Sequence, residues 1–418
     1  MQKSKLQPKN WQKVKLGEIL EKIIDNRGKT PLLSNSGHEL IETFQMSINN
    51  KYPDLTNKSK QKYVSKKTYN NWFRSGHPKE GDILFSTVGA SIPQWCFVPK
   101  NSKYCIAQNL IALRPDGSKV LPEYLKSYFD QKKFVKEVKG IIIGAAQPSI
   151  KVPHLLSLKI SLPSLNDQKR IAGILSAFND KIELNNKISK NLEQMAQAIF
   201  KEWFVKFNFP GHEKVKMVDS ELGKIPEEWK AKKIGSIANV ILGGTPSRAN
   251  SEYWGGSVPW INSGKVNEFR ITSASEYITK IGLERSNARL MPRRTIVIAI
   301  TGATLGQVSL LEIEASANQS VVGIFGSNVV SPEFLYLYTK QNINRIIQAA
   351  GGGAQQHINK QIVAEYPILI PCKKTLFPFT NTVQPIFNKI ANLVLENQKL
   401  ASLRDLLLPK LMSGEIRV

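Results

Sequence analysis

The residues of this chain that could do chemistry lie in short glycine-containing turns. Arg27-Gly28-Lys29-Thr30 contains the Gly-Lys-Thr of a phosphate-binding loop. Such a loop also needs a glycine five residues before its Gly-Lys pair, and Ile23 occupies that position. The segment therefore predicts a turn and not a nucleotide site.

Other catalytic patterns also fail. Pro115-Asp116 with Glu123 and Lys126 approaches a nuclease constellation, but its Glu-to-Lys spacing is one residue too long, and Asp116-Gly117 is typical of a turn. The sequence has neither the acidic-Pro-Pro-aromatic tetrapeptide nor the glycine-rich nucleotide fingerprint of a self-contained methyltransferase. The histidines form no ligand pair; they are His38, His77, His154, His212 and His357. We therefore expect no catalytic and no metal-binding residue in this chain.

The charge of the chain indicates a nucleic-acid partner. The 418 residues carry a formal charge of +25, while 41% of them are hydrophobic. This combination describes a folded protein with a basic surface and not a disordered tail. A solubilising surface is the alternative, but binding of nucleic acid explains so large an excess better.

The chain repeats itself, with an offset that falls from 218 to 208 residues. Such drift is expected where surface loops differ between related units. The matched pairs are Trp11-x4-Leu16-Gly17-Glu18-Ile19 with Trp229-x4-Ile234-Gly235-Ser236-Ile237, Gly28-Lys29-Thr30-Pro31 with Gly244-Thr245-Pro246, residues 81–89 with 294–302, Ala107-Gln108-Asn109 with Ala317-Asn318-Gln319, and Gly144-Ala145-Ala146-Gln147 with Gly352-Gly353-Ala354-Gln355. The chain is thus one globular unit and one long helix, written twice.

Residues 164–207 predict the first long helix. Apolar residues recur there at spacings of three and four, which is typical of a helix with a buried seam. Ser164 and Asp167 form a capping-box pattern at its start. The helix would be roughly 60 Å long, and Asn185 and Ser189 fall on its seam, as polar residues do that fix the register of a coiled coil.

The second long helix lies 208 residues further on. Leu175, Ile182 and Ile199 correspond there to Val383, Ile390 and Leu407, so we expect the two helices to pair. Because proline is tolerated in the first helical turn, Pro385 predicts a start near residue 385, and Pro409 predicts an end at Leu408.

Within each unit we expect strands at residues 83–88, 159–162, 295–300 and 367–370, helices at residues 121–138 and 332–350, and a linker at residues 209–228. The N-terminus has no apolar core of a signal peptide, and no apolar run approaches eighteen residues. Cys96, Cys105 and Cys372 form no CxxC pair, which indicates a reducing, cytoplasmic setting without structural zinc.

These features resemble the specificity (S) subunit of type I restriction–modification systems. The most specific pieces are Asp167-Gln168-Lys169-Arg170-Ile171-Ala172-Gly173-Ile174-Leu175, residues 192–205, Glu221-Leu222-Gly223-Lys224-Ile225-Pro226, residues 254–261 and residues 407–416. The second helix departs from the pattern, since it has Thr375-Leu376-Phe377-Pro378-Phe379-Thr380 in place of the Asp-Gln-Lys-Arg-Ile-Ala start.

The resemblance implies an α+β fold with two similar α/β target-recognition domains separated by two long helices that form an antiparallel coiled coil. The domains would be residues 1–163 and, with the linker, 209–371; the conserved-region helices would be residues 164–208 and 372–418. Each domain would read one half of an asymmetric, bipartite DNA site. The subunit would hold no cofactor of its own: two modification (M) subunits carry S-adenosylmethionine, and restriction (R) subunits use ATP and Mg.

DNA contacts are expected from polar and basic side chains in the glycine-rich loops, because arginine pairs with guanine and asparagine or glutamine with adenine. In the first domain these are Arg27, Lys29, Thr87, Gln147, Ser149 and Lys151. In the second they are Arg248, Asn262, Lys265, Thr301, Thr304, Gln356, His357 and Lys360. Trp203 and Phe204, at the end of the first helix, would anchor an M subunit or pack within the helix pair.

Two other functions compete with this interpretation. The first is an independent sequence-specific DNA-binding regulator, which would work without M subunits. The second is an intact restriction endonuclease, which would cut DNA with Mg by itself.

Overall fold

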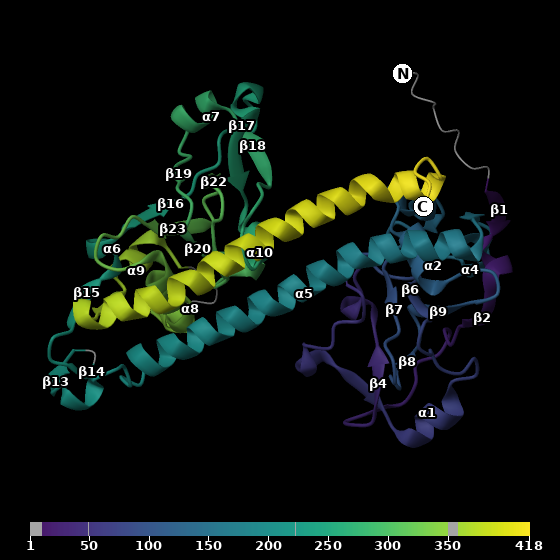
Figure 1. Cartoon of the computed structure of the whole chain (residues 1–418), viewed down its shortest axis with the longest axis horizontal. Helices are drawn as coiled ribbons and strands as arrows, with labels where there is room; N and C mark the ends of the chain where they lie inside the picture. Colours follow the sequence, from purple (N-terminus) through teal and green to yellow (C-terminus); the bar gives the residue numbers. More distant parts are fainter. Residues whose placement is uncertain (1–10, 49, 222, 350–357) are drawn as a thin grey trace. The chain divides into compact units, whose positions relative to one another are not determined.

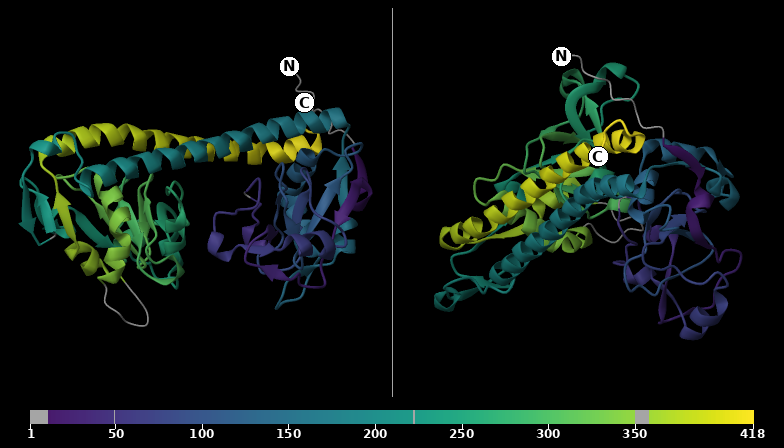
Figure 2. Two further views of the ribbon diagram at one scale, coloured as in Figure 1. Left: turned by 90° about the horizontal axis from the view of Figure 1, so that it is seen from below. Right: turned by 45° about the vertical axis from the view of Figure 1, so that its right-hand side comes forward.

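The computed structural model describes residues 11–48, 50–221, 223–349 and 358–418. The chain forms two compact units (Figure 1). Unit 1 comprises Met1–Lys181 and Leu400–Val418, and unit 2 comprises Ile182–Lys399. Each unit contains a mixed α/β domain and parts of both long helices, and in each the domain lies on one side of its helices (Figure 2).

The domain of unit 1 is built on two four-stranded sheets, ordered β2-β9-β6-β7 and β3-β5-β4-β8. A ribbon of β1 and β12 joins its first and last strands, and a hairpin of β10 and β11 precedes α4. The strands are β1 (Gln12–Lys15), β2 (Leu20–Ile24), β3 (Leu33–Ser34), β4 (His38–Ile41), β5 (Lys62–Val64), β6 (Ile83–Ser86), β7 (Trp95–Phe97), β8 (Cys105–Ile106), β9 (Leu110–Pro115), β10 (Ile142–Ile143), β11 (Ser149–Ile150) and β12 (Lys159–Leu162). The short helices are α1 (Lys66–Trp72), α2 (Pro122–Phe129), α3 (Lys132–Gly140) and α4 (Val152–Leu156).

Unit 2 repeats this plan. Its sheets are ordered β16-β23-β20-β21 and β18-β17-β22-β19, and its ribbon pairs β15 with β24. The strands are β13 (Met217–Ser220), β14 (Gly223–Pro226), β15 (Lys230–Lys233), β16 (Asn239–Leu242), β17 (Trp254–Ile261), β18 (Glu276–Ile278), β19 (Leu290–Met291), β20 (Ile296–Ala299), β21 (Val308–Leu310), β22 (Ala315–Ala317), β23 (Val321–Phe325) and β24 (Pro367–Ile370). The short helices are α6 (Ile234–Ile237), α7 (Lys280–Glu284), α8 (Pro332–Gln348) and α9 (Lys360–Glu365).

The ribbons confirm the repeat at both of its ends. Gln12 pairs with Leu162 in unit 1, and Lys230 pairs with Ile370 in unit 2. These pairs reproduce the two offsets found in the sequence, 218 residues at the start of the domain and 208 at its end. The predicted fold class, two similar domains with two long helices, is confirmed.

The long helices are α5 (Leu165–Phe204) and α10 (Lys373–Ser413). The amide of Asp167 donates to Ser164 Oγ at 3.1 Å, which is the predicted cap. In unit 1, Ile171 and Leu175 of α5 belong to one hydrophobic cluster with Leu411 and Met412 of α10. These contacts bring the beginning of α5 to the end of α10, so the pairing there is antiparallel.

In unit 2 the same pairing continues over the other part of each helix. The side chain of Asn185, on the predicted seam, donates to Asn397 Oδ1 at 2.8 Å and to Glu396 Oε2 at 2.9 Å. Phe200 packs against Phe379 with ring centroids 6.1 Å apart. Asn185 and Ser189 are both buried, which confirms their seam positions.

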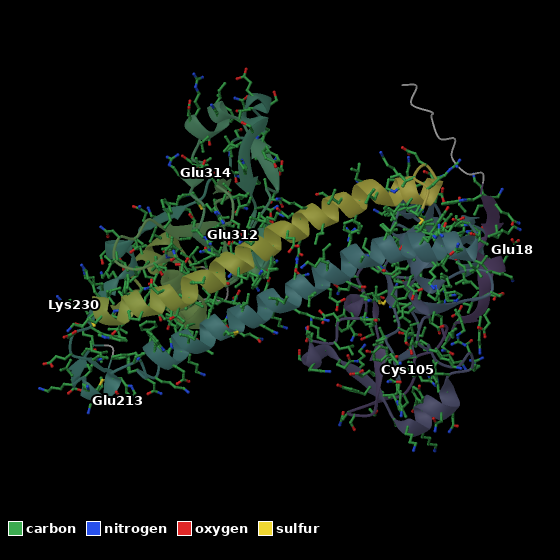
Figure 3. All side chains as sticks on the ribbon, viewed as in Figure 1. Glu18, Cys105, Glu213, Lys230, Glu312 and Glu314 are labelled. Carbon is green, nitrogen blue, oxygen red and sulfur yellow. The ribbon has the colours of Figure 1, made fainter. Side chains whose placement is uncertain are left out.

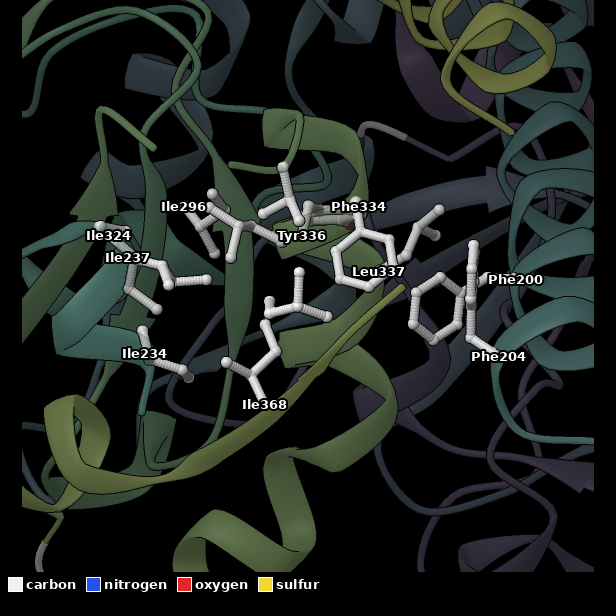
Figure 4. Packing of buried hydrophobic residues seen from close by; sticks show 14 of the residues in the cluster. Phe200, Phe204, Ile234, Ile237, Ile296, Ile324, Phe334, Tyr336, Leu337 and Ile368 are labelled. Carbon is white, nitrogen blue, oxygen red and sulfur yellow. The ribbon is translucent and has the colours of Figure 1, made fainter. Parts of the chain in front are cut away.

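A hydrophobic core joins the helix pair of unit 2 to its first sheet (Figure 4). Phe200 and Phe204 of α5 meet Phe334 of α8, and Phe334 shares the cluster with Ile296 and Ile324 of the sheet. Figure 4 shows the two phenylalanines of α5 beside the ring of Phe334. The core therefore fixes the domain of unit 2 on α5.

A buried ionic cluster lies beside this core. The Arg270 guanidinium donates to Glu193 Oε2 of α5 at 3.1 Å and to the Tyr336 hydroxyl of α8 at 3.0 Å. Its Nε lies 3.9 Å from Glu312 Oε1. Glu312 is labelled in Figure 3. Lys340 adds a hydrogen bond to Glu193. The side chains of Arg270, Glu193 and Glu312 are 1%, 4% and 0% exposed, so burial makes their pairing obligatory.

The predicted bounds of the second long helix, 385 to 408, are wrong, because α10 contains Pro378, Pro385 and Pro409 within its length. All three rings are exposed. An interior proline costs about 3 kcal/mol, whereas burial of one large apolar side chain gains about 1.5–3 kcal/mol. Leu376, Phe379, Val383, Phe387 and Ile390 are all buried on the opposite side, so packing outweighs the prolines.

Two further predictions need correction. Residues 121–138 form two helices and not one, because Asp130 and Gln131 separate α2 from α3. Residues 209–228 are not a plain linker: they contain the β13–β14 hairpin. Phe209 and Ile225 are buried, and Phe209 joins the core of unit 2, so this segment is held by hydrophobic contacts.

The three cysteines are free. Cys96 and Cys105 are buried, and Cys372 is partly exposed just before α10 (Cys105 is labelled in Figure 3). Burial raises the pKa of both Cys96 and Cys105 to about 12. In the part of the chain that the structure describes, no helix is both long enough and apolar enough to cross a membrane.

Candidate nucleic-acid interface

In unit 1, the turn after β2 places Arg27 beside the end of β6. The Arg27 guanidinium donates from Nε to Asp25 Oδ1 at 2.8 Å and from Nη2 to Asp25 Oδ2 at 2.7 Å. Its Nη1 donates to Thr87 Oγ1 at 3.3 Å. The hydrogen bonds from Arg27 hold the pKa of Asp25 below its ordinary value. Arg27 is therefore a pre-positioned cation, and Lys29 is exposed in the same turn.

The hairpin β10–β11 completes this surface of unit 1. The amide of Ile150 donates to the Thr87 carbonyl at 2.8 Å, and Val88 forms a bridge with Ser149. Gln147 lies exposed in the turn of the hairpin. Lys151 is exposed at the start of α4. The structure thus brings Arg27, Thr87 and Ser149 together and places Gln147 and Lys151 on adjoining segments.

In unit 2, the corresponding strand end carries Thr301 and Thr304. The Thr304 hydroxyl donates to the Thr301 carbonyl at 3.4 Å across the 3-10 turn Gly302–Thr304. The amide of Ile358 donates to the Ile300 carbonyl at 3.3 Å, which matches the contact between Ile150 and Thr87. Lys360 is exposed at the start of α9. Gln356 and His357 lie outside the described residues.

Asn262 and Lys265 lie together on a neighbouring turn. Asn262 Oδ1 accepts the Lys265 amide at 3.2 Å and thereby caps the 3-10 helix Ser263–Asn267, which contacts the turn of Thr301 and Thr304. Lys265 Nζ donates to Glu268 Oε1 at 2.6 Å and to Ser273 Oγ at 2.9 Å. Both side chains are therefore engaged within unit 2, with the Lys265 side chain only 19% exposed.

Arg248 is bound by a residue of the second sheet of unit 2. Its guanidinium makes two hydrogen bonds of 2.7 Å to Glu276 on β18 and lies 3.5 Å from the centre of the Trp254 ring. These bonds to Arg248 lower the pKa of Glu276. Arg248 thus belongs to the second sheet of unit 2, whereas Arg27 belongs to the turn beside the first sheet of unit 1.

A pair of glutamines was missed in the sequence. Gln108 hydrogen-bonds Thr30 in unit 1, and Thr245 Oγ1 donates to Gln319 Oε1 at 2.6 Å in unit 2. Gln108 therefore corresponds to Gln319, so the alignment of Ala107-Gln108-Asn109 with Ala317-Asn318-Gln319 was wrong by one residue. The strand registers agree, because Ser86 pairs with Leu110 and Ala299 with Val321. The segment between these paired positions is two residues shorter in unit 2, which hid the match.

The two aromatic residues predicted as partner anchors lie at the end of α5. Phe204 is 9% exposed and packs against Trp229, Phe334 and Phe379, so it follows the core-packing alternative. Trp203 is partly exposed and contacts Phe379 at 5.8 Å between ring centroids. Docking of a partner on Trp203 stays a prediction.

Comparisons with known proteins agree with this architecture. A family model of the type I restriction modification DNA specificity domain matches residues 8–194 and again residues 226–393. The type I restriction enzyme HindI specificity subunit of Haemophilus influenzae is 28% identical over 401 residues, which cover 81% of this chain and 87% of that protein. The MjaIX specificity subunit of Methanocaldococcus jannaschii is 28% identical over 303 residues, which cover 72% and 70%.

Among solved structures, a type I restriction–modification S subunit from M. genitalium has the same fold. It aligns over 98% of both chains with a TM-score of 0.56, at 14% sequence identity. The two matches of the family model cover most of this sequence and coincide with its two structural repeats. The chain therefore belongs to the type I restriction–modification DNA specificity family.

Proposed function

We propose that this chain is the DNA-recognition subunit of a type I restriction–modification complex. Each unit reads one half of an asymmetric, bipartite site, and the long helices dock modification subunits and, through them, restriction subunits. The chain contributes no catalytic residue. S-adenosylmethionine belongs to the modification subunits, and ATP and Mg belong to the restriction subunits.

The observation that carries this proposal is the repeat of one framework with different side chains on its loops. Equivalent turns carry Arg27 in unit 1 and a Gly243-Gly244 pair in unit 2. Equivalent strand ends carry Thr87 and Ile300. Their carbonyls accept equivalent backbone hydrogen bonds, from the amides of Ile150 and Ile358. Two similar domains with different loops are suited to bind two different short DNA sequences. Contacts to bases determine which sequence is bound, whereas contacts to phosphates only fix the position of the protein on the duplex.

Exchange of one domain tests this proposal. Residues 215–370, which contain the whole sheet framework of unit 2, are replaced by the matching segment of another S subunit. We expect one half-site of the modified sequence to change and the other to stay. The measurement is methylome sequencing of the host, with a gene deletion as the reference.

The deletion strain is the control, since every motif that depends on this chain must disappear there. A change in both half-sites would show that the domains do not read independently. Co-purification of modification subunits with the tagged chain separates this function from that of an independent regulator, which has no need of them.

A further inference from the structure

The second sheets of the two units share a framework that the sequence comparison did not find. β4 lies antiparallel to β5 and parallel to β8, and β17 lies antiparallel to β18 and parallel to β22. A short helix follows the antiparallel partner strand in each sheet, α1 after β5 and α7 after β18. The sequences that connect strand and helix are Tyr63-Val64-Ser65-Lys66 and Tyr277-Ile278-Thr279-Lys280, which are 214 residues apart.

Both helices begin with the same cap and are fixed by their inner sides. Ser65 Oγ accepts the Thr68 amide at 3.1 Å, and Thr279 Oγ1 accepts the Gly282 amide at 2.9 Å. The inner side of α1 packs Tyr69 against the sheet, with its ring stacked between His38 and His77 at 3.8 Å and 3.6 Å. In α7 the equivalent Leu283 packs against Trp260 and Ile278.

The outer faces of these helices differ. Four exposed side chains at helical spacing cover α1, with Arg74 exposed just after its end; they are Lys66, Lys67, Asn70 and Asn71. The equivalent exposed positions are Lys280, Ile281 and Glu284 of α7 and Arg285 just after its end. Within the described part of the chain, the five side chains of the α1 face make no hydrogen bond or ion pair. A shared framework thus carries two different exposed faces.

The surroundings of α1 are strongly positive. Residues 55–79 contain seven exposed lysines and arginines and no aspartate or glutamate. Of these cations, Lys58 and Lys62 pair with Glu39 and Glu42 on β4 and its following turn. The remaining excess would attract the phosphates of a duplex.

The segment after each helix also contacts the turn that follows the first strand of the other sheet, β2 in unit 1 and β16 in unit 2. In unit 1 the Asn26 side chain donates to the Gly76 carbonyl and accepts from the Ser75 amide, both at 2.9 Å, so it ties the segment after α1 to the turn of Arg27. In unit 2 the turn packs directly against the segment after α7. A Cβ on Gly244 would lie 2.2 Å from the Asn287 carbonyl oxygen, so only glycine fits.

We propose that the outer faces of α1 and α7 are the base-reading surfaces of the two units and enter the major groove of the half-sites. This inference rests on the proposed function. In unit 1, Lys66 and Lys67 contact phosphates, while Asn70, Asn71 and Arg74 read adenine and guanine edges. In unit 2, Arg285 reads guanine and Glu284 accepts from cytosine.

Two variants test the assignment in the native host, which supplies the partner subunits. Asn70→Ala with Asn71→Ala should relax or change one half-site, and Arg285→Ala should affect the other half-site alone. Each lost bidentate base contact should reduce discrimination at its position roughly 5- to 150-fold. Methylome sequencing measures the modified motif. Motifs identical to that of the wild type in both variants would overturn the inference.

A second measurement keeps the test independent of folding and of partner subunits. The purified full-length chain is titrated with a short non-specific duplex over a range of salt. Lys66→Gln with Lys67→Gln should reduce the slope of log K against log salt by about two. Lys132→Gln with Lys133→Gln is the matched control, because this exposed lysine pair also begins a short helix of unit 1.

The outcomes are separable. If both lysine pairs change the slope equally, α1 has no special role, and the inference is overturned. If the asparagine variant loses all modification, a slope change confined to the α1 pair supports the inference, and no such change overturns it. If deletion of the gene leaves every methylated motif in place, the proposed function itself fails.

Discussion

Replacing Arg270 by methionine is expected to lower the free energy of unfolding of unit 2 by about 3–5 kcal/mol. The change removes one of the cations paired with Glu193, where Lys340 remains, and withdraws one cation from Glu312, and both carboxylates stay buried. A buried charge without its partner costs far more than a lost surface contact. Urea unfolding of the full chain, with hydrogen exchange in α8 as a local probe of unit 2, measures the effect.

Arg248→Met is the matched control for this experiment. Arg248 also makes a two-bond contact with a glutamate, but its side chain is 55% exposed and that of Glu276 is 43% exposed. An exposed pair contributes about 0–1 kcal/mol. Equal losses in the two variants would contradict the view that burial makes the Arg270 cluster costly to break.

The same cluster predicts a dependence on acid. Burial raises the pKa of Glu193. The charges of Arg270 and Lys340 and the hydrogen bonds from Lys340 and Tyr336 together lower it by more than burial raises it, so the pKa of Glu193 lies below its ordinary value. A lowered pKa stabilises the fold above the unfolded pKa of about 4.3. That contribution is lost as the pH falls through the folded pKa, and the loss should be smaller in the Arg270→Met variant.

Binding of the full chain to duplex DNA is expected to weaken by about a thousandfold or more between low and moderate salt. The excess of +25 charges is large enough for many phosphate contacts. A protein with about 6–10 such contacts loses roughly 10³–10⁵ in affinity between 50 and 200 mM salt, because bound counterions are released. Fluorescence anisotropy with a labelled duplex measures the slope.

Thermal unfolding of the chain at the same salt concentrations serves as the control, since it reveals any loss of folded protein. A flat dependence of affinity on salt would contradict the assignment of the charge to a phosphate-facing surface. It would leave the excess of lysine and arginine as a feature of solubility only.

Local signals in the sequence were sufficient for much of the fold. The strands at residues 159–162 and 367–370 were predicted within their observed bounds, because β-branched or apolar runs end there at Pro163 and Pro371. The cap at Ser164 and the polar seam at Asn185 were also predicted, since each depends on a spacing within one helix. Such features need no knowledge of distant contacts.

Other features depend on tertiary contacts and could not be predicted locally. The start of α10 was misplaced because the rule for proline ignores the core that Phe379 and Phe387 enter. The helix α1 has seven residues, too few to show a helical period. Its correspondence with α7 appears only when β5 and β18 are matched in their sheets, which aligns Tyr63-Val64-Ser65 with Tyr277-Ile278-Thr279.

For the candidate site, the sequence pointed to turns of which some lie together in the fold, but it did not predict the state of their side chains. Arg27 and Thr87 do come together across 60 residues of sequence. Arg248 and Lys265 were predicted from residue type alone. Arg248 is held by Glu276 of β18, whose approach depends on the folded sheet, and Lys265 is held by Glu268 at the end of the same 3-10 helix. Residue type can therefore propose a DNA contact, whereas burial and neighbours decide whether the side chain is available.

The three thiols differ in exposure, so one of them can be labelled selectively with a dye. Thiol reagents attack the thiolate, and burial with a pKa of about 12 leaves Cys96 and Cys105 almost entirely protonated near neutral pH. Cys372 is partly exposed immediately before α10. A maleimide dye should therefore label the unmodified chain once, at Cys372, and mass spectrometry of the labelled peptides would check this. The dye would report arrival of a partner near the start of α10 without any cysteine substitution.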